Sequence, residues 1–255
     1  MTKKELYGTL KRAFEKVLKD AAVTEGSVQV VCRGLTPEEA IGKTQRQDFP
    51  IITGKDVMIE AVYKGYRGQA FTDAPSQYTG GLGEILDLDI ENNPRDRGVF
   101  IATVNAVMAA LGRCTGTVHC RTDGPEQCAL EMQAYLKASY PEARRIALIG
   151  YQPALLEMLA TSGYALRVLD LNPANVGQRR YGVMVEDGSV MQDAVTADSD
   201  LILCTGSTLC NGTIVDYMDL PVPVLFFGIT IAGSADLLGV KRVCFAEDLK
   251  NSSGR

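Results

Sequence analysis

The stretch Cys204-Thr-Gly-Ser-Thr-Leu-Cys-Asn-Gly-Thr213 joins two kinds of predicted local structure. The apolar run Asp200-Leu-Ile-Leu-Cys204 leads into it and predicts a buried strand of a parallel sheet. A helix over residues 208–218 is expected to follow. In open α/β sheets, ligands bind where parallel strands end and the chain turns into a helix. The stretch therefore indicates the place of a ligand site, although it does not name a reaction.

The segments around this stretch repeat the same alternation of strand and helix from residue 145 onwards. Predicted strands cover residues 146–149, 166–169, 182–185, 200–204, 222–227 and 243–245, and predicted helices cover residues 153–161, 189–197, 208–218 and 232–238. Strands that alternate with helices form βαβ units, whose parallel sheet has helices on both faces. The second half of the chain therefore predicts a Rossmann-like α/β domain.

The chain before residue 145 has a different order of elements. Thr2 and Glu5 form a capping-box pattern, which predicts a helix over residues 2–20. The other predictions are strands at 27–33, 56–63 and 66–72, a short turn of helix at Pro37, helices at 84–88, 94–111 and 125–139, and an irregular segment at 73–83 that is rich in Gly, Pro and hydroxyl residues. This order predicts an α+β unit. We expect two domains, at residues 1–120 and 121–255.

Composition narrows the class of protein and its partners. The 255 residues are 46% hydrophobic and 22% charged, which is typical of a globular protein, and the net charge of −5 gives no reason to expect nucleic acid as a partner. No apolar run is long enough to span a membrane and no signal peptide is recognisable, so we expect a cytoplasmic protein. Seven cysteines favour reduced thiols, metal ligation or redox chemistry over a disulfide framework. The sequence leaves open whether the protein forms a homo-oligomer.

The first turn of the predicted parallel sheet argues against a standard dinucleotide. Gly150 ends one strand and Asp170 ends the next, 20 residues on, where an acid commonly binds a ribose hydroxyl. However, the turn reads Gly150-Tyr-Gln-Pro153 and not G-x-G-x-x-G, so NAD is not expected. A nucleoside without pyrophosphate, such as S-adenosylmethionine, is less excluded, and Asp170 could also be a helix cap. Asn172 and the pair Arg179-Arg180 lie beyond it and could close the same cleft.

The opening stretch itself is the better candidate for binding an anion. Amides at a helix N-terminus attract negative charge, and the nearby hydroxyl and amide side chains add hydrogen-bonding groups. The residues concerned are Thr205, Gly206, Ser207, Thr208, Asn211 and Thr213. Gly228 ends the next strand in a similar way, so two adjacent loops are expected to line one cleft. Helix capping without a ligand is the alternative.

A cluster of soft ligands precedes the α/β half. Cys114, His119, Cys120 and Cys128 could bind zinc, iron or copper, because thiolates and imidazole suit such metals. Their spacing is not C-x-x-C, and buried thiols without a metal are the alternative. The remaining cysteines differ in position: Cys204 and Cys210 could supply thiols from the other side of the cleft, while Cys32 and Cys244 fall in predicted strands and are expected in the core.

Three residues of the first half are candidates for catalysis. Asp73 directly follows a predicted strand, and together with Glu84 it could ligate a cation or act as acid and base. Lys43 is the third candidate. Turn formation by Asp73 and solvation of Glu84 are the alternative explanation for the two acids.

Three segments resemble the family known as the putative heavy-metal chelation domain. They are Thr205-Gly-Ser-Thr-Leu-Cys-Asn-Gly-Thr213, Gly98-Val-Phe-Ile-Ala-Thr-Val-Asn-Ala106 and Gly68-Gln-Ala-Phe-Thr72. The resemblance implies an N-terminal domain similar to that of enolase, then a Rossmann-like domain, with a site between them. It also implies that matching residues face this cleft, namely Thr72, Asn105, Thr205, Gly206, Asn211 and Thr213. The general family pattern does not assign the cluster of His119, Cys120 and Cys128, which could mark a subgroup.

Two functions follow as hypotheses. The first is binding of a heavy or transition metal, or of a metal chelate, between the domains. The second is an enzyme that acts on a small anionic or nucleoside-containing substrate in the same cleft.

Overall fold

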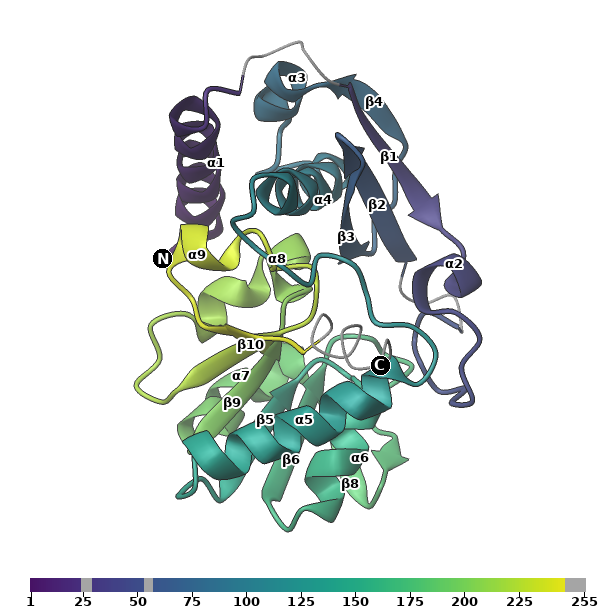
Figure 1. The fold of residues 1–255 in the computed structure, drawn as a ribbon. Coiled ribbons are helices and arrows are strands. Elements are labelled where there is room, and N and C mark those ends of the chain that lie inside the picture. Colours follow the sequence, from purple (N-terminus) through teal and green to yellow (C-terminus); the bar gives the residue numbers. More distant parts are fainter. Residues whose placement is uncertain (24–28, 53–56, 246–255) are drawn as a thin grey trace.

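The computed structural model describes residues 1–23, 29–52 and 57–245, and it contains two separate β-sheets (Figure 1). A four-stranded antiparallel sheet lies in the upper part of Figure 1 and a seven-stranded, mostly parallel sheet lies in the lower part. The mixed α/β class expected from the sequence is confirmed. Among the helices of the described residues, none combines the length and apolar character that crossing a membrane requires.

The first sheet has the strand order β3-β2-β1-β4. Its strands are β1 (Gln29–Leu35), β2 (Val57–Tyr63), β3 (Tyr66–Thr72) and β4 (Tyr78–Gly81). The predicted hairpin between β2 and β3 is confirmed: Lys64 and Gly65 both have positive φ, 50° and 81°, as a tight two-residue hairpin turn requires. The short helix α2 (Pro37–Ile41) follows β1 and begins with a capping box at Thr36.

Three helices lie on one side of this sheet (Figure 1). They are α1 (Lys3–Asp20), α3 (Leu82–Asp87) and α4 (Pro94–Ala110). Helix α4 packs against β2 and β3, and Gly68 of β3 lies directly against its backbone. A Cβ at Gly68 would lie 2.2 Å from the backbone nitrogen of Ala106, so only glycine allows this packing.

The prediction of an irregular segment at residues 73–83 is wrong in its second half. Strand β4 and the start of α3 lie there, and β4 pairs with β1 in an antiparallel register from Gln29↔Gly81 to Cys32↔Tyr78. Glycines are poor strand formers by themselves, but a neighbouring strand about 50 positions away supplies the pairing partners. Local composition could not show that partner.

The second sheet has the order β11-β10-β9-β5-β6-β8-β7, and only β7 runs antiparallel to its neighbour. The strands are β5 (Arg145–Ile149), β6 (Ala165–Asp170), β7 (Arg179–Arg180), β8 (Val183–Asp187), β9 (Leu201–Thr205), β10 (Val224–Phe227) and β11 (Arg242–Val243). The associated helices are α5 (Gly124–Ser139), α6 (Pro153–Thr161), α7 (Gly188–Ala197) and α9 (Ala235–Leu238). The strand–helix alternation predicted from residue 145 is confirmed.

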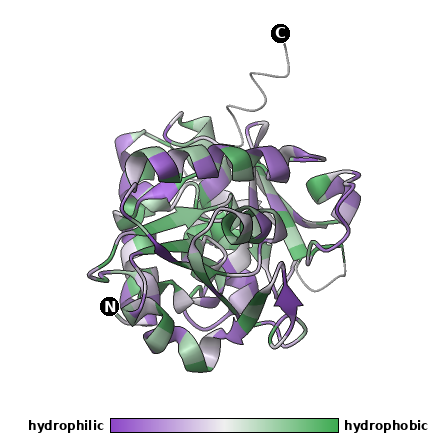
Figure 2. Cartoon of the chain, turned by 90° about the horizontal axis from the view of Figure 1, so that it is seen from below, coloured by the Kyte–Doolittle hydropathy of each residue, from purple (hydrophilic) through white to green (hydrophobic). Residues whose placement is uncertain are grey.

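Alternate residues of the central strands enter different hydrophobic clusters. Leu148 and Leu203 pack with α5 and α6, whereas Ile149 and Ile202 pack in the cluster that also holds α1 and α4. One face of the parallel sheet therefore belongs to the same hydrophobic cluster as α1 and α4, and α4 also packs against the antiparallel sheet. In Figure 2 the inner strands are predominantly hydrophobic, and hydrophilic residues lie on the outward side of the helices.

The prediction of one helix over residues 208–218 is wrong, because the helix is much shorter. Helix α8 covers only Thr208–Asn211, Gly212 adopts a left-handed conformation with φ of 77°, and a 3-10 helix, η1 (Thr213–Tyr217), follows. The side-chain oxygen of Asn211 accepts a hydrogen bond of 2.9 Å from the amide of Thr213. A Cβ at Gly212 would also lie 2.8 Å from the hydroxyl of Tyr7, so α1 packs directly on this break.

Candidate functional site at the carboxyl edge of the parallel sheet

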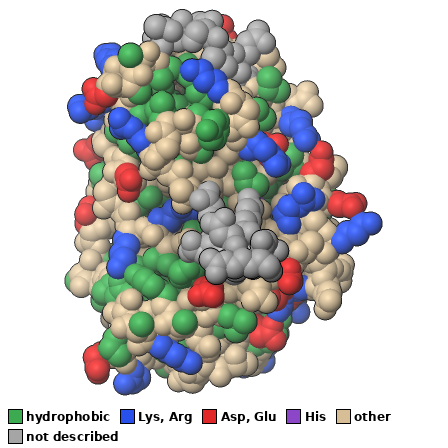
Figure 3. Space-filling model, viewed as in Figure 1, with side chains coloured by type: hydrophobic (Ala, Val, Ile, Leu, Met, Phe, Trp, Pro, Cys, Tyr) green, Lys and Arg blue, Asp and Glu red, His purple; other side chains and the backbone are tan. Residues whose placement is uncertain are grey.

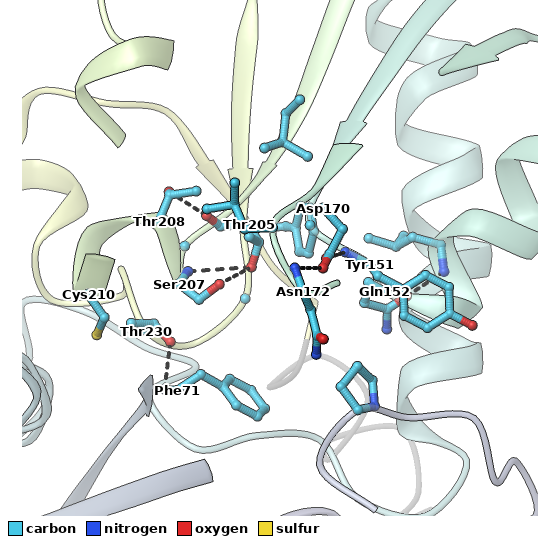
Figure 4. Close-up of a pocket in the computed structure, with 18 of the residues that line it drawn as sticks. Phe71, Tyr151, Gln152, Asp170, Asn172, Thr205, Ser207, Thr208, Cys210 and Thr230 are labelled. Carbon is cyan, nitrogen blue, oxygen red and sulfur yellow. Dashed lines mark hydrogen bonds between the residues drawn. The ribbon is translucent and has the colours of Figure 1, made fainter. Parts of the chain in front are cut away.

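A cavity of about 900 Å³ lies at the carboxyl ends of β5, β6, β9 and β10. The end of β3, the segment 49–51, residues 119–120, the first part of α5 and residues 243–244 form other parts of its wall. Strands β6 and β9 lie on opposite sides of β5, so the cavity opens at the point where the order of the strands reverses. Open α/β sheets bind ligands at this position. Figure 4 shows Thr205 and Ser207 on one side of it and Asn172 and Gln152 on the other.

The turns after β5 and β9 press against each other at the floor of the cavity. Gly150 has φ of 88°, and a Cβ there would lie 2.5 Å from the methyl carbon of Thr205. The hydroxyls of Thr205 and Ser207 are 3.1 Å apart, and the hydroxyl of Thr208 donates to the carbonyl of Thr205 at 2.7 Å. The hydroxyl groups of this turn therefore bond to each other and to the backbone, as the capping alternative expected.

The structure gives little electrostatic support for an anion at this turn. Helix α8 is a single turn, so its dipole is much weaker than that of the longer helix expected from the sequence. Of the described residues that line the cavity, none is Lys or Arg, whereas Asp73, Asp170 and Asp216 all line it. Arg179 and Arg180 are exposed and lie outside the cavity wall.

Asp170 lines the cavity but already holds the neighbouring loops. One carboxylate oxygen accepts a hydrogen bond of 2.6 Å from the amide of Tyr151, and the other accepts one of 2.7 Å from the amide of Asn172. The side chain of Asn175 donates a weaker bond of 3.3 Å. These contacts fix the first turn of the sheet. They leave Asp170 less available for a ribose hydroxyl than the sequence alone indicated.

Most residues predicted to bind a ligand line this cavity. They are Thr72, Gly150, Asp170, Asn172, Thr205, Gly206, Ser207, Thr208, Asn211, Thr213 and Gly228. Asn105 is the exception, because it is completely buried beside the cavity. Its amide nitrogen donates to the carbonyls of Gln69, Ile229 and Thr230, and its oxygen accepts from the amide of Gly233. Asn105 therefore joins the two sheets and has no group left for a ligand.

The structure separates the four predicted metal ligands. His119, Cys120 and Cys128 line the cavity, whereas Cys114 packs against the hydrophobic core outside it. Cys244 takes the place of Cys114: it was expected in a core strand, but it follows β11, is half-buried and lines the cavity. Cys32 is buried in the core, as expected, and no disulfide joins any of the seven cysteines.

The chemical state of these groups follows from their burial. Nδ1 of His119 lies 2.5 Å from the carbonyl oxygen of Cys120, which can only accept, so Nδ1 carries the proton and Nε2 has a lone pair. Burial lowers the pKa of His119 and raises the pKa of Cys128 to about 11, and it raises the pKa of Cys120 further. Without a metal, the imidazole is neutral and the thiols are protonated at neutral pH.

On the opposite side of the cleft, only one of the two thiols reaches the cavity. Cys204 is completely buried in β9, and Cys210 lines the cavity from α8 (Figure 4). Burial raises the pKa of Cys210 to about 12, although the nearby Arg97 opposes this effect. Across the described residues, no three His, Cys, Asp or Glu side chains converge to form a ready metal site.

Only one of the catalytic candidates lies in the cavity. Asp73 lines it at the end of β3. Glu84 lies on α3 outside the wall and accepts a hydrogen bond of 3.1 Å from the hydroxyl of Tyr78. Lys43 is exposed and pairs with Glu38 at 3.7 Å, also outside the cavity. The proposed pairing of Asp73 with Glu84 therefore does not occur within this site.

An ionic network holds the segment 42–52 against the helices beside the cavity. Arg46 is mostly buried and pairs with Glu126 of α5 at 2.9 Å and with Glu157 of α6. Asp48 accepts a hydrogen bond of 3.2 Å from the hydroxyl of Tyr151. Residues 49–51 of the same segment form part of the cavity wall. The partners lie about 80 to 110 positions from Arg46, so no local pattern could have identified them.

The fold and the site together define a two-sheet α/β protein with a ligand-sized cavity at the switch point of its parallel sheet. Residues 135–238 match the family model DUF364, which is described as "Putative heavy-metal chelation". The chain is therefore similar to this family, as its sequence motifs indicated. The matched region contains the turns after β5, β6 and β9. It does not contain His119, Cys120, Cys128 or Cys244.

Two solved structures of this family resemble the chain. A DUF364 protein of unknown function from Pyrococcus horikoshii has a TM-score of 0.52 and 16% identity, over 87% of this chain and 79% of that chain. A DUF364 protein of unknown function from Desulfitobacterium hafniense has a TM-score of 0.44 and 10% identity, over 72% of each chain. The first shows that the fold is shared. No curated protein matches the chain.

Proposed function

We propose that the cavity binds a transition metal in the form of a small organic chelate. The observation that carries this proposal is a cavity of about 900 Å³ with His119, Cys120 and Cys128 in one wall and hydroxyl and amide groups in another. This volume is that of a small-molecule site, which is typically about 300–1,000 Å³, and is much larger than a single ion needs. The family description supports a role in metal chelation.

The residues in the wall fit such a ligand chemically. Thiols and imidazole are ligands for soft and borderline metals, and Nε2 of His119 has the lone pair that coordination requires. Because no three of these groups converge among the described residues, the organic part of the ligand would supply the other donor atoms. Hydroxyls of Thr205, Ser207 and Thr213 would then contact the polar groups of the chelate.

Calorimetry under anaerobic conditions tests the proposal. The titrants are zinc, copper and iron as preformed complexes with histidine or citrate, the same chelators without metal, and the metal salts alone. We expect heat of binding for at least one complex and weaker binding of the same chelator without metal. Ser207→Phe fills the cavity and should abolish binding, whereas Ser139→Phe, at an exposed position on α5, should not. Equal binding by the Ser207→Phe variant would overturn the proposal.

A second candidate function is an enzyme acting on a small nucleoside-containing substrate, for example one linked to S-adenosylmethionine. The position of the cavity at the strand switch point favours it, and Asp73 is the candidate acid or base within reach. S-adenosylmethionine and nucleosides in the same calorimetric series distinguish the two functions. Binding of these compounds, with none by the metal complexes, would favour the enzyme.

A further inference from the structure

Three cysteines from separate parts of the chain lie in one wall of the cavity. Cys120 belongs to the connector between α4 and α5, Cys128 to the start of α5, and Cys244 to the segment after β11. Each is half-buried, in contrast to Cys32 and Cys204 in the core. All three lie outside residues 135–238, so the match to the family model assigns no role to them.

Their neighbours show that the three cysteines occupy adjoining parts of this wall, although among the described residues they do not converge on one point. A Cβ at Gly124 would lie 2.8 Å from the Cβ of Cys120 and 3.7 Å from its sulfur. Cys128 is four residues after Gly124 in α5 and therefore projects from the same face of the helix. Cys120 thus packs on the helix surface one turn before Cys128. Only glycine at position 124 lets Cys120 come so near.

Cys244 joins this pair from the other side. The backbone N–H of Phe245 is near enough to Cys128 to lower the pKa of its thiol, and Cys244 is near enough to raise it, so the segment after β11 lies next to α5. A Cβ at Gly116 would lie 3.6 Å from the sulfur of Cys244, so this thiol also contacts the connector that carries Cys120. The connector, α5 and the segment after β11 therefore each contribute one thiol to the same wall.

We propose that Cys120, Cys128 and Cys244 bind a soft d10 metal ion such as Cu(I) two thiols at a time, through the protein's own sulfur atoms. Soft thiolate ligands select such ions, and two sulfurs are enough because these ions accept linear two-coordinate geometry. Each thiol that binds releases one proton, so capture of one Cu(I) by two cysteines gives a bis-thiolate complex with a charge of −1 and two protons. The third thiol can replace either of the two bound thiolates, so the ion can exchange between sulfur atoms at the cavity. This inference deepens the proposed function and rests on it only for the location of the site.

Competition for Cu(I) tests the inference on the full chain. The reduced protein is titrated anaerobically with Cu(I) in the presence of bathocuproine disulfonate, whose colour reports the metal that the protein has not taken. We expect one Cu(I) per chain. Changing any two of Cys120, Cys128 and Cys244 to Ser should weaken binding at least about tenfold, because only one sulfur then remains for a d10 ion that prefers sulfur to oxygen. Cys114→Ser is the matched control and should change the affinity less than about twofold, since Cys114 lies outside the cavity.

A second measurement avoids dependence on variants that fold poorly. The wild-type protein is labelled with maleimide, with and without Cu(I), and each cysteine is followed by mass spectrometry. Cu(I) should protect Cys120, Cys128 and Cys244 and leave Cys114 unchanged. Equal protection of Cys114, or unchanged affinity in a variant lacking all three cavity thiols, would overturn the inference. Ser207→Phe should retain the Cu(I) site, so failure of chelate binding and failure of the thiol site give different results.

Discussion

The side-chain oxygen of Asn105 accepts a hydrogen bond of 2.7 Å from the backbone amide of Gly233, which joins α4 to the loop after β10. The amide nitrogen of the same side chain donates to the carbonyl of Gln69 in β3 and to two carbonyls of that loop. One buried side chain thereby connects the antiparallel sheet to the parallel sheet. This loop forms part of the cavity wall, so Asn105 shapes the site without entering it.

Replacing Asn105 by Ala should lower the free energy of unfolding by about 3 kcal/mol, because buried backbone groups would lose their partners. Urea denaturation measures the change. Asn211→Ala is the control: Asn211 is exposed and, among the residues that the structure describes, its side chain bonds only to nearby Thr213, so its loss should cost less than about 1 kcal/mol. Similar losses for both variants would contradict the structural role of Asn105.

Gly68→Ala should also destabilise the protein, by about 1–3 kcal/mol, because the added methyl group would overlap the backbone of α4. Gly34→Ala provides a matched comparison in the same sheet. A Cβ at Gly34 has no neighbour within 4 Å among the described residues, so this substitution should be neutral or slightly stabilising. Thermal denaturation of the two variants tests whether close packing at Gly68 fixes the position of α4.

Protein stability should fall as the pH decreases below about 6.5. Burial lowers the pKa of His119 in the folded state, so the unfolded chain binds a proton more readily than the folded chain. The contribution of His119 to stability is complete above the pKa that it has in the unfolded chain. It is lost as the pH falls towards the lower pKa of the folded chain, at a rate of at most about 1.4 kcal/mol per pH unit.

His119 is the only histidine, so one variant isolates its contribution. Urea denaturation at pH 7.5, 6.5 and 5.5, with EDTA present, compares the wild type with His119→Gln, whose side-chain amide can still donate to the carbonyl of Cys120. The variant should show the smaller loss of stability over this range. Parallel pH profiles for the two proteins would refute the predicted effect of His119.

Arg46→Met should open the cavity to solvent more often, because it removes the charge that binds the segment 42–52 to Glu126 and Glu157. The rate of maleimide labelling at Cys120 and Cys128 reports this opening. An increase of about fivefold or more is expected, which corresponds to a loss of about 1 kcal/mol from the closed state. Cys32 in the core should stay slow, which separates local opening from global unfolding.

Arg145→Met is the control for this experiment. Arg145 pairs with Asp198 and Asp200 at exposed positions outside the cavity wall, and its loss should leave the labelling rates of the cavity thiols unchanged. On the face seen in Figure 3, acidic and basic side chains are scattered and do not form one basic patch. If the loss of any surface charge raised the labelling rates of the cavity thiols, Arg46→Met and Arg145→Met would raise them equally.

Local patterns predicted most of the elements because their causes are local. The capping box at Thr2 began α1 where expected, and apolar runs such as Ile146-Ala-Leu-Ile149 became buried parallel strands. The same logic placed the turns after β5 and β9 together at one sheet edge, since parallel strands end at the same side. It failed for residues 208–218, where the left-handed Gly212 and its contact with Tyr7 interrupt the helix.

The sequence by itself determined the class of fold, most of the order of elements and the edge where the cavity lies, because periodicity and strand ends depend on neighbouring residues. Tertiary structure alone decided which side chains meet there. It placed Cys244 beside Cys128, left Cys114 outside the cavity, and turned Asn105 into a connection between the sheets. These relations join residues more than 100 positions apart, and packing of the two sheets, not local sequence, brings them together.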